Sequence, residues 1–163
     1  MENLFDWFDW DALLTAIDMA RVAHAGQVDK AGEPYICHVL RVGMSLLPDM
    51  GAAVAGVLHD ILEDSNFKPE TLDTFGERIV NAVVALTREP TQSYEEYIER
   101  VYRNELARKV KLADLRDNQD PDRHRRAIAN GADPDKIREL QARYAKAIIE
   151  LESGSLRFGF PGR

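Results

Sequence analysis

The sequence predicts an all-α protein that folds as one domain. Apolar residues recur about every 3.6 positions along most of the chain, and no segment alternates convincingly between apolar and polar residues as a half-buried strand would. The 163 residues are 45% apolar and 30% charged, a balance typical of a globular protein large enough to bury a core. We therefore expect a bundle of about eight to ten helices over residues 1–151, without a sheet, and a flexible tail over residues 152–163.

Two helices and a loop are predicted at the start of the chain. The first helix, Trp10–Ala25, carries apolar residues over a broad face and ends at Gly26. The polar segment Gln27–Pro34 follows as a loop, and Tyr35–Leu47 returns to the helical period until Pro48 ends it. Aromatic residues around the N-terminus are expected to cap the bundle, or alternatively to form a partner surface: Phe5, Trp7, Phe8 and Trp10.

The third helix is predicted to open at Asp49 or Met50 and to continue as far as Asp64. Its run of small apolar residues, 52–58, predicts a helix that is buried on most sides. A short helix over residues 70–75 follows, because a proline precedes it at a suitable first helical position.

Four further helices and a loop are predicted for the second half. Glu77–Arg88 has an apolar face despite its valines, and Ser93 is a suitable N-cap for a helix that runs to about residue 102. Glu105–Asp117 carries a buried stripe. The polar, basic segment Gln119–Pro134 contains two prolines and a glycine and is predicted to be a loop, after which Asp135–Leu151 forms the last helix.

Charge and cysteine content exclude several classes of function. A net charge of −7 argues against nonspecific binding of nucleic acid, although it leaves room for a small phosphate-bearing substrate in a locally positive pocket. No apolar run approaches the roughly 20 residues needed to span a bilayer, and the N-terminus is acidic where a secretory signal is basic, so we expect a cytoplasmic protein. A single cysteine, Cys37, excludes an internal disulfide and a multi-thiolate zinc site.

The most informative cluster of polar residues is the adjacent pair His59 and Asp60, which is followed four residues later by Glu63 and Asp64. On a helix, residues four apart lie nearly above one another, so all four side chains would share one edge. Burying several charges without partners is costly, and a divalent cation offsets that cost for carboxylates and neutral imidazoles together. The alternative is a helix end with solvated acids and one hydrogen-bonded histidine.

His38 and Asp114 are the candidates for the rest of a metal site. His38 lies in the first turn of a predicted helix, and Asp114 interrupts a buried stripe where an acid needs a partner. Together with His59 and Asp60 they would supply two nitrogens and two oxygens from three helices, which suits zinc, manganese or iron. His124 has arginine neighbours that disfavour a metal, so we expect it to be solvated.

Several short motifs occur in order along the chain. They are Ala23-His24-Ala25-Gly26-Gln27, Gly32-Glu33-Pro34-Tyr35-Ile36-Cys37-His38, Leu58-His59-Asp60-Ile61-Leu62-Glu63-Asp64, Phe75-Gly76 and Lys111-Leu112-Ala113-Asp114. Together they resemble the HD-domain hydrolases of the RelA/SpoT type, and most closely the small stand-alone alarmone hydrolases that lack a synthetase domain. The resemblance covers roughly residues 12–151 and implies an HD-domain helical bundle.

The resemblance also implies a reaction. Members of this family hydrolyse the 3′-pyrophosphate of guanosine tetra- or pentaphosphate, and some stand-alone members act on other phosphorylated nucleotides. Glu63 and Asp64 match the acidic pair that handles the attacking water and protons. One divalent ion is implied, usually Mn²⁺, with Zn²⁺ or Fe²⁺ as alternatives, and the matching ligands are His38, His59, Asp60 and Asp114.

The sequence departs from the family pattern around the substrate. Asp29 stands where alarmone hydrolases commonly carry an arginine that meets the base, and Pro121 falls where a hydroxyl residue is frequent. Lys30 and Asn118 match residues that border the nucleotide, and Tyr35 is either a stacking platform or a core aromatic. Arg116 is a further substrate-binding candidate. A nearby basic segment either replaces the missing cation or is simply solvated: Arg116, Arg123, Arg125 and Arg126.

The sequence therefore predicts a metal-dependent phosphohydrolase, first of all a guanosine-3′,5′-bis(diphosphate) 3′-pyrophosphohydrolase that uses a metal-activated water. One alternative is an HD phosphatase that acts on another nucleotide or phosphomonoester. The other is a module that keeps the fold and senses a nucleotide without catalysis. The predicted partner in each case is a small phosphorylated molecule, with no membrane and no nucleic acid, and the oligomeric state is left open.

Overall fold

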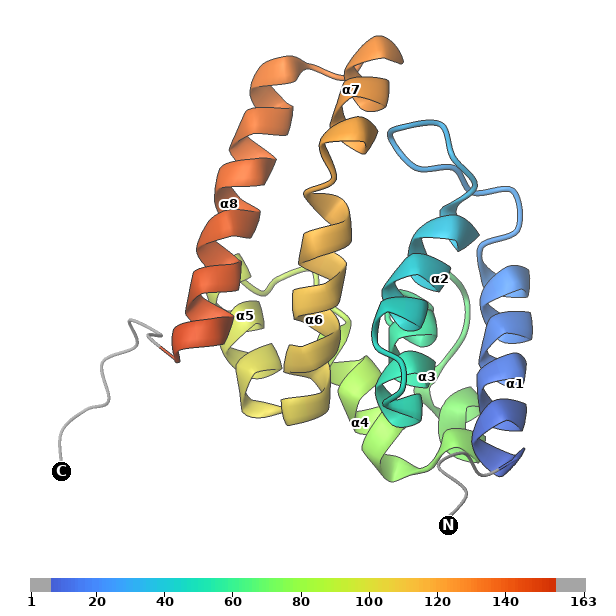
Figure 1. Cartoon of the computed structure of the whole chain (residues 1–163). Helices are drawn as coiled ribbons and strands as arrows, with labels where there is room; N and C mark the ends of the chain where they lie inside the picture. Colours follow the sequence, from blue (N-terminus) through green and yellow to red (C-terminus); the bar gives the residue numbers. More distant parts are fainter. Residues whose placement is uncertain (1–6, 155–163) are drawn as a thin grey trace, which may run out of the picture.

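The computed structural model describes residues 7–154, with side chains from Trp10 onward (Figure 1). The predicted all-α fold is confirmed: these residues form eight α-helices and one 3₁₀ helix, no β-strand, and one isolated bridge between Val28 and Pro34. The helices are α1 (Trp7–Ala23), α2 (Tyr35–Ser45), α3 (Met50–Leu58), η1 (Pro69–Phe75), α4 (Glu77–Leu86), α5 (Tyr94–Arg103), α6 (Glu105–Asn118), α7 (Pro121–Ala129) and α8 (Pro134–Ser153).

Two predictions concern the ends of the chain. Most of the aromatic cluster proposed as a cap, including Phe5 and the side chains of Trp7 and Phe8, lies outside the described residues, as does the predicted tail from residue 155 onward. Helix α8 continues to Ser153, so the first residues assigned to the tail are helical. Among the described residues, no helix combines the length and apolar character that a membrane crossing requires.

Helix α3 lies at the centre of the bundle and packs against α1, α2, α4 and α6 (Figure 1). The buried apolar residues form two clusters, and α3 contributes to each of them. Ala52 and Ala55 pack with α4, α5, α6 and α8, while Val54, Val57 and Leu58 pack with α1 and α2. A helix that is apolar all round is stable only when covered on most sides. The burial predicted for the run 52–58 is therefore confirmed, and the residues at the end of α3 are held in the interior.

The prediction that the third helix continues to Asp64 is wrong. Helix α3 ends at Leu58, His59 is its C-cap, and the chain then makes tight turns in which the amide of Asp64 donates to the carbonyl of Asp60 (3.0 Å). The carbonyl of Gly56 belongs to the last turn of the helix, where carbonyls lack intrahelical partners. It accepts instead from Nδ1 of His59 (2.7 Å), so the histidine side chain itself caps the helix.

The predicted loop over residues 119–134 is also wrong, because most of it is helix α7 (Figure 1). Pro121 stands at the first helical position, where proline begins helices, and the Asp120 side chain accepts from the amide of Asp122 (2.7 Å) as an N-cap. Ala127 is buried under the helix. Helix α7 therefore lies beside the 24–34 loop, where the Asn130 side chain donates to the carbonyl of Ala31 (2.7 Å).

Helices α2 and α3 cross closely at two glycines. A Cβ at Gly43 would lie 2.5 Å from Cγ2 of Val57 and 2.9 Å from the carbonyl oxygen of Ala53, and a Cβ at Gly56 would lie 2.9 Å from Cα of Gly43. Real side chains do not approach this closely, so the crossing requires glycine on both helices. This contact sets the distance between His38 on α2 and His59 at the end of α3.

Gly43→Ala is therefore expected to lower the free energy of unfolding by about 1–2 kcal/mol, because overpacking at the crossing outweighs the better helix propensity of alanine. Gly51→Ala in α3 is the matched control. Its Cβ would meet nothing closer than 3.7 Å, so this change should raise stability by about 0.5 kcal/mol. Urea unfolding of both variants measures the difference, and equal stabilisation by the two alanines would contradict the close crossing.

Candidate metal centre and substrate cavity

Two imidazoles and two carboxylates meet where α2, the end of α3 and α6 converge. Nε2 of His59 lies 3.0 Å from Oδ2 of Asp60 and 3.7 Å from Oδ1 of Asp114. Nε2 of His38 lies 3.2 Å from Oδ1 of Asp114 and 3.8 Å from Oδ2 of Asp60. The ligand atoms of His38, His59 and Asp60 all lie within 4.8 Å of one another. The structure thus brings together the four residues that the sequence singled out as metal ligands.

The chemistry of this cluster fits a divalent cation. His38 and His59 are each 2% exposed and Asp114 is 4% exposed, so three of the four residues are removed from water. Nε2 of His59 is buried and has no hydrogen-bond partner among the described residues, which is costly unless a ligand supplies one. A set of two nitrogens and two oxygens is a common donor set for Zn²⁺, Mn²⁺ and Fe²⁺.

The four groups stabilise one another's charged forms. Although burial opposes protonation, the carboxylates of Asp60 and Asp114 hold the pKa of His59 well above its usual value. Burial likewise opposes ionisation of the acids, but the imidazole of His59 holds the pKa of Asp60 below its usual value, and Lys111 with His38 does the same for the pKa of Asp114. Positive charge at this point, whether protons or a metal ion, is therefore strongly favoured.

Each candidate ligand is held by a further hydrogen bond. Asp114 accepts hydrogen bonds from Nζ of Lys111 (2.8 Å) and from the side-chain Nδ2 of Asn118 (2.6 Å). Asp60 accepts one from the hydroxyl of Tyr35 (2.6 Å). Nδ1 of His59 is hydrogen-bonded to the carbonyl of Gly56, and Nδ1 of His38 is hydrogen-bonded to Oδ2 of Asp117 (2.7 Å). Both histidines thus direct Nε2 toward the carboxylates, the arrangement in which outer hydrogen bonds orient metal-binding imidazoles.

Glu63 and Asp64 lie beside this cluster on the turns that follow α3. Both reach solvent, but neighbouring atoms shield part of each carboxyl group from water, and this shielding together with the carboxylate of Asp60 raises the pKa of each above its usual value. Oε2 of Glu63 accepts from the backbone amide of Arg88 (3.1 Å). Asp64, with Tyr35, borders a cavity of about 330 Å³. A carboxyl group that reaches solvent beside a cation site is suited to proton transfer.

A second cavity, of about 360 Å³, lies between the 27–34 loop, α6, α7 and α8. Lys30, Tyr35 and Asn118, which the sequence assigned to substrate, all line it. Tyr35 and Asn118 also donate hydrogen bonds to Asp60 and Asp114, so the cavity directly adjoins the candidate metal centre. Apolar side chains from α8 complete the wall, among them Ile137 and Leu140. A largely preformed pocket with a few convergent polar groups is typical of small-molecule sites.

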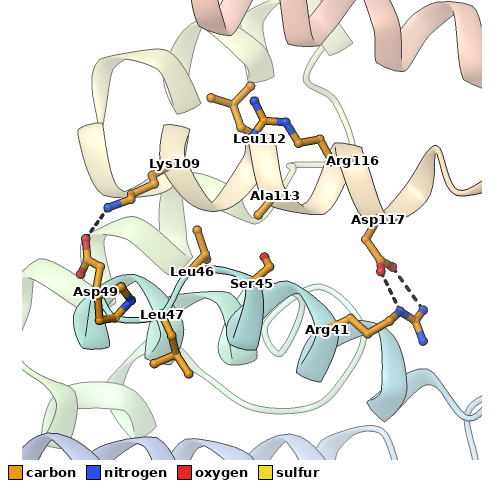
Figure 2. Close-up of a pocket in the computed structure, with 11 residues that line it drawn as sticks. Arg41, Ser45, Leu46, Leu47, Asp49, Lys109, Leu112, Ala113, Arg116 and Asp117 are labelled. Carbon is orange, nitrogen blue, oxygen red and sulfur yellow. Dashed lines mark hydrogen bonds and ion pairs between the residues drawn. The ribbon is translucent and has the colours of Figure 1, made fainter.

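Arg116 does not lie in this cavity. It lines a separate groove of about 940 Å³ between α2 and α6 (Figure 2) and pairs with Glu152 (2.8 Å). Helix α6 therefore contributes residues to two different cavities, and Arg116 belongs to the groove rather than to the cavity that Lys30 lines. Of the remaining candidate cations, Arg125 pairs with Asp122, and Arg126 with Glu33 (2.8 Å).

Asp29 is not free to meet a substrate. Oδ1 of Asp29 accepts from the amides of Ala31 (2.8 Å) and Glu33 (2.9 Å), which stabilises the loop, and Oδ2 accepts from Arg123 (2.9 Å). Despite burial, these hydrogen bonds lower the pKa of Asp29. Arg123 is itself 9% exposed and lines the second cavity, of about 360 Å³. The charge reversal at position 29 is thus neutralised by a cation from α7.

Sequence reasoning missed Asp117, and it did not recognise the role of Lys111. Both lie on α6 three residues from Asp114, the spacing at which helix residues share a face, and both carry charges within an apolar stripe. That spacing was the available signal. Arg41, which pairs with Asp117 across the α2–α6 contact, had no comparable signal because its partner is far away in the sequence.

Comparison with known proteins supports this fold. No protein-family model matches the chain. A guanosine-3′,5′-bis(diphosphate) 3′-pyrophosphohydrolase of Borreliella burgdorferi is 37% identical over 93 residues, which are 54% of this chain and 14% of the relative. An Aquifex aeolicus protein of the same name is 32% identical over 115 residues, which are 63% of this chain and 16% of the relative. The chain therefore spans only a small part of the length of these relatives.

A solved structure of a metazoan ortholog of SpoT, described as hydrolysing ppGpp, matches 90% of this chain and 85% of its own chain, with a TM-score of 0.69 and 24% identity. This match shows that the fold is shared. Together with the two bacterial relatives, it confirms the resemblance to RelA/SpoT-type hydrolase domains that the motifs predicted.

Proposed function

We propose that this chain is a metal-dependent phosphohydrolase that removes the 3′-pyrophosphate from guanosine 3′,5′-bis(diphosphate). The observation that carries the proposal is the cluster of two imidazoles and two carboxylates beside a cavity. Tyr35 and Asn118 line that cavity and also donate hydrogen bonds to the two carboxylates of the cluster. The names of the bacterial relatives support the choice of substrate. We also propose that the activity is cytoplasmic, as expected from the sequence.

We propose that His38, His59, Asp60 and Asp114 hold one divalent ion, with Mn²⁺ as the first choice and Zn²⁺ or Fe²⁺ as alternatives. Such an ion supplies Lewis acidity to a phosphoryl oxygen and lowers the pKa of water. The protein supplies the orientation: His38 and His59 direct Nε2 inward because their Nδ1 atoms are engaged elsewhere. Lys111 compensates part of the negative charge of Asp114.

Glu63 and Asp64 are the proposed acids and bases of the reaction. Both carboxyl groups lie beside the candidate ligands and remain accessible to water, so either can exchange a proton with water or with the leaving group. Asp64 borders the same space as Tyr35, whose hydroxyl bonds Asp60, so it is the better placed of the two to orient the attacking water. Glu63 lies next to it, and the charge of Asp64 contributes to the raised pKa of Glu63.

The substrate cavity offers the nucleotide a mixed environment. Lys30 and Asn118 provide donors for phosphate or ribose oxygens, and the apolar wall from α8 can cover a base. The balanced reaction consumes one water, breaks the ester link between the 3′ oxygen and the pyrophosphate, and yields guanosine diphosphate and pyrophosphate.

One observation favours a related substrate as the second candidate. Position 29 is an aspartate, and the nearby Arg123 is paired with it, so neither residue offers a free planar cation to stack on guanine. An HD phosphatase acting on another nucleotide would need no such group. The fold and the metal centre would be the same in both cases.

A nucleotide panel assayed with Mn²⁺ separates these candidates. We expect release of pyrophosphate from guanosine tetra- and pentaphosphate to exceed phosphate release from nucleoside mono-, di- and triphosphates. Lys30→Ala should raise KM more than it lowers kcat, because Lys30 lines the cavity without touching the candidate ligands. Activity on another nucleotide with none on guanosine tetraphosphate would reject the first candidate, and a folded, Mn²⁺-loaded protein without any hydrolysis would favour the sensing module.

A further inference from the structure

Asp117 on α6 contacts the candidate ligand His38 from behind. Oδ2 of Asp117 lies 2.7 Å from Nδ1 of His38, while Nε2 of the same ring faces Asp114 and Asp60. The His38 side chain is 2% exposed, so water does not compete for this hydrogen bond. An imidazole binds a metal through its unprotonated nitrogen, and its other nitrogen then carries a hydrogen that needs an acceptor.

Two arginines hold the Asp117 carboxylate in place. Arg41 donates through Nε to Oδ1 (2.7 Å) and through Nη2 to Oδ2 (3.2 Å), a paired contact that Figure 2 shows across the groove. Arg123 on α7 donates to Oδ2 from the other side. The carboxylate is therefore anionic and fixed, because paired guanidinium contacts constrain both its position and its plane.

The same contacts connect the candidate metal centre to the wall of the substrate cavity. Arg123 lines that cavity and uses its second terminal nitrogen to bind Asp29, which organises the 27–34 loop. A continuous series of charged contacts thus runs from Asp29 through Arg123 and Asp117 to His38. Neither Asp117 nor Arg41 lies among the residues that line this cavity, so their contacts act through His38 rather than on substrate.

We propose that Asp117 is a positioning residue for His38. It accepts the Nδ1 hydrogen, fixes the ring so that Nε2 faces Asp60 and Asp114, and is itself held by Arg41 and Arg123. This proposal rests on the proposed metal centre and adds a residue to it. Outer carboxylates of this kind typically change metal affinity about 10- to 100-fold when removed.

The competing explanation is that Asp117 only neutralises two arginines and stabilises the fold. Two variants distinguish the explanations. Asp117→Ala removes the acceptor that faces Nδ1 of His38. Asp117→Asn keeps the shape but offers one carbonyl oxygen where two carboxylate oxygens now face donors, so it retains part of the support for His38. Asp49→Asn is the matched control, because it removes a carboxylate paired with Lys109 (2.6 Å) in the same groove (Figure 2) and keeps a good N-cap for α3.

The experiment measures Mn²⁺ affinity of the folded full chain and, with Zn²⁺ as a diamagnetic ion, the ring N–H resonance of His38 by NMR. We expect Asp117→Ala to weaken Mn²⁺ binding by about 10- to 100-fold and to lose the protected Nδ1–H resonance, with Asp117→Asn intermediate. Asp49→Asn should stay within about twofold of the unaltered chain in affinity, because it lies outside this series of contacts. If Asp117→Ala does not fold, the comparison of Asp117→Asn with Asp49→Asn decides the question.

Unchanged Mn²⁺ affinity and an unchanged His38 resonance in the folded Asp117 variants would overturn the proposal, whatever their stability. That result would leave the metal centre intact. Failure of the unaltered chain to bind either Mn²⁺ or Zn²⁺ is a different outcome, because it would overturn the proposed function and this inference together.

Discussion

Asp60→Asn is expected to remove bound metal and to lower hydrolysis on the order of 10³-fold, because a metal ion contributes several kcal/mol to phosphoryl transfer and each 1.4 kcal/mol is tenfold in rate. The amide keeps the size of the side chain but loses the negative charge that lies 3.0 Å from Nε2 of His59. Metal content after dialysis and kcat at saturating Mn²⁺ measure the two effects.

Asp73→Asn on η1 is the control for that change. Asp73 is exposed and lines none of the cavities described above, so the same replacement there should alter neither quantity. A fully loaded Asp60→Asn protein with near-normal kcat would show that Asp60 is not a ligand.

Asp64→Asn is expected to lower kcat by about 10²- to 10⁴-fold while metal content stays normal, because it removes a proton-transfer group and leaves the four candidate ligands in place. Glu63→Gln should have the smaller effect, since the Glu63 carboxylate is already engaged by the amide of Arg88. The measurement is single-turnover hydrolysis with metal content determined on the same samples.

These two variants also test the division of labour within the acidic cluster. Loss of metal together with activity in Asp64→Asn would place Asp64 among the ligands. Unchanged kcat in both variants would exclude the pair from proton transfer.

Helix periodicity predicted most of the fold, because burial of an apolar face dominates helix formation in this chain. The run 52–58 illustrates this: small apolar residues on every side require a central position, and α3 occupies it. The two errors came from local signals with two meanings. Proline breaks a helix in its interior but begins one at its first position, as Pro121 does in α7. The side chain of His59 ends α3 by binding a backbone carbonyl, which periodicity does not reveal.

The candidate metal ligands were predictable for a different reason. His38, His59, Asp60 and Asp114 are polar residues in apolar surroundings, and such residues need partners wherever the chain folds. The residues that hold them were harder to predict, because a partner such as Asp117 contacts His38 from 79 positions away and only the packing of α2 on α6 brings the two together. The role of Asp29 depends in the same way on Arg123, which α7 delivers.

Pyrophosphate release from guanosine 3′,5′-bis(diphosphate) by metal-stripped protein, titrated with Mn²⁺, tests the central claim most directly. The account predicts no release before Mn²⁺ is added and a rate that saturates at about one ion per chain, as expected for one centre with four protein ligands. A rate that is the same with and without the ion, or saturation unaffected by Asp60→Asn, would contradict it.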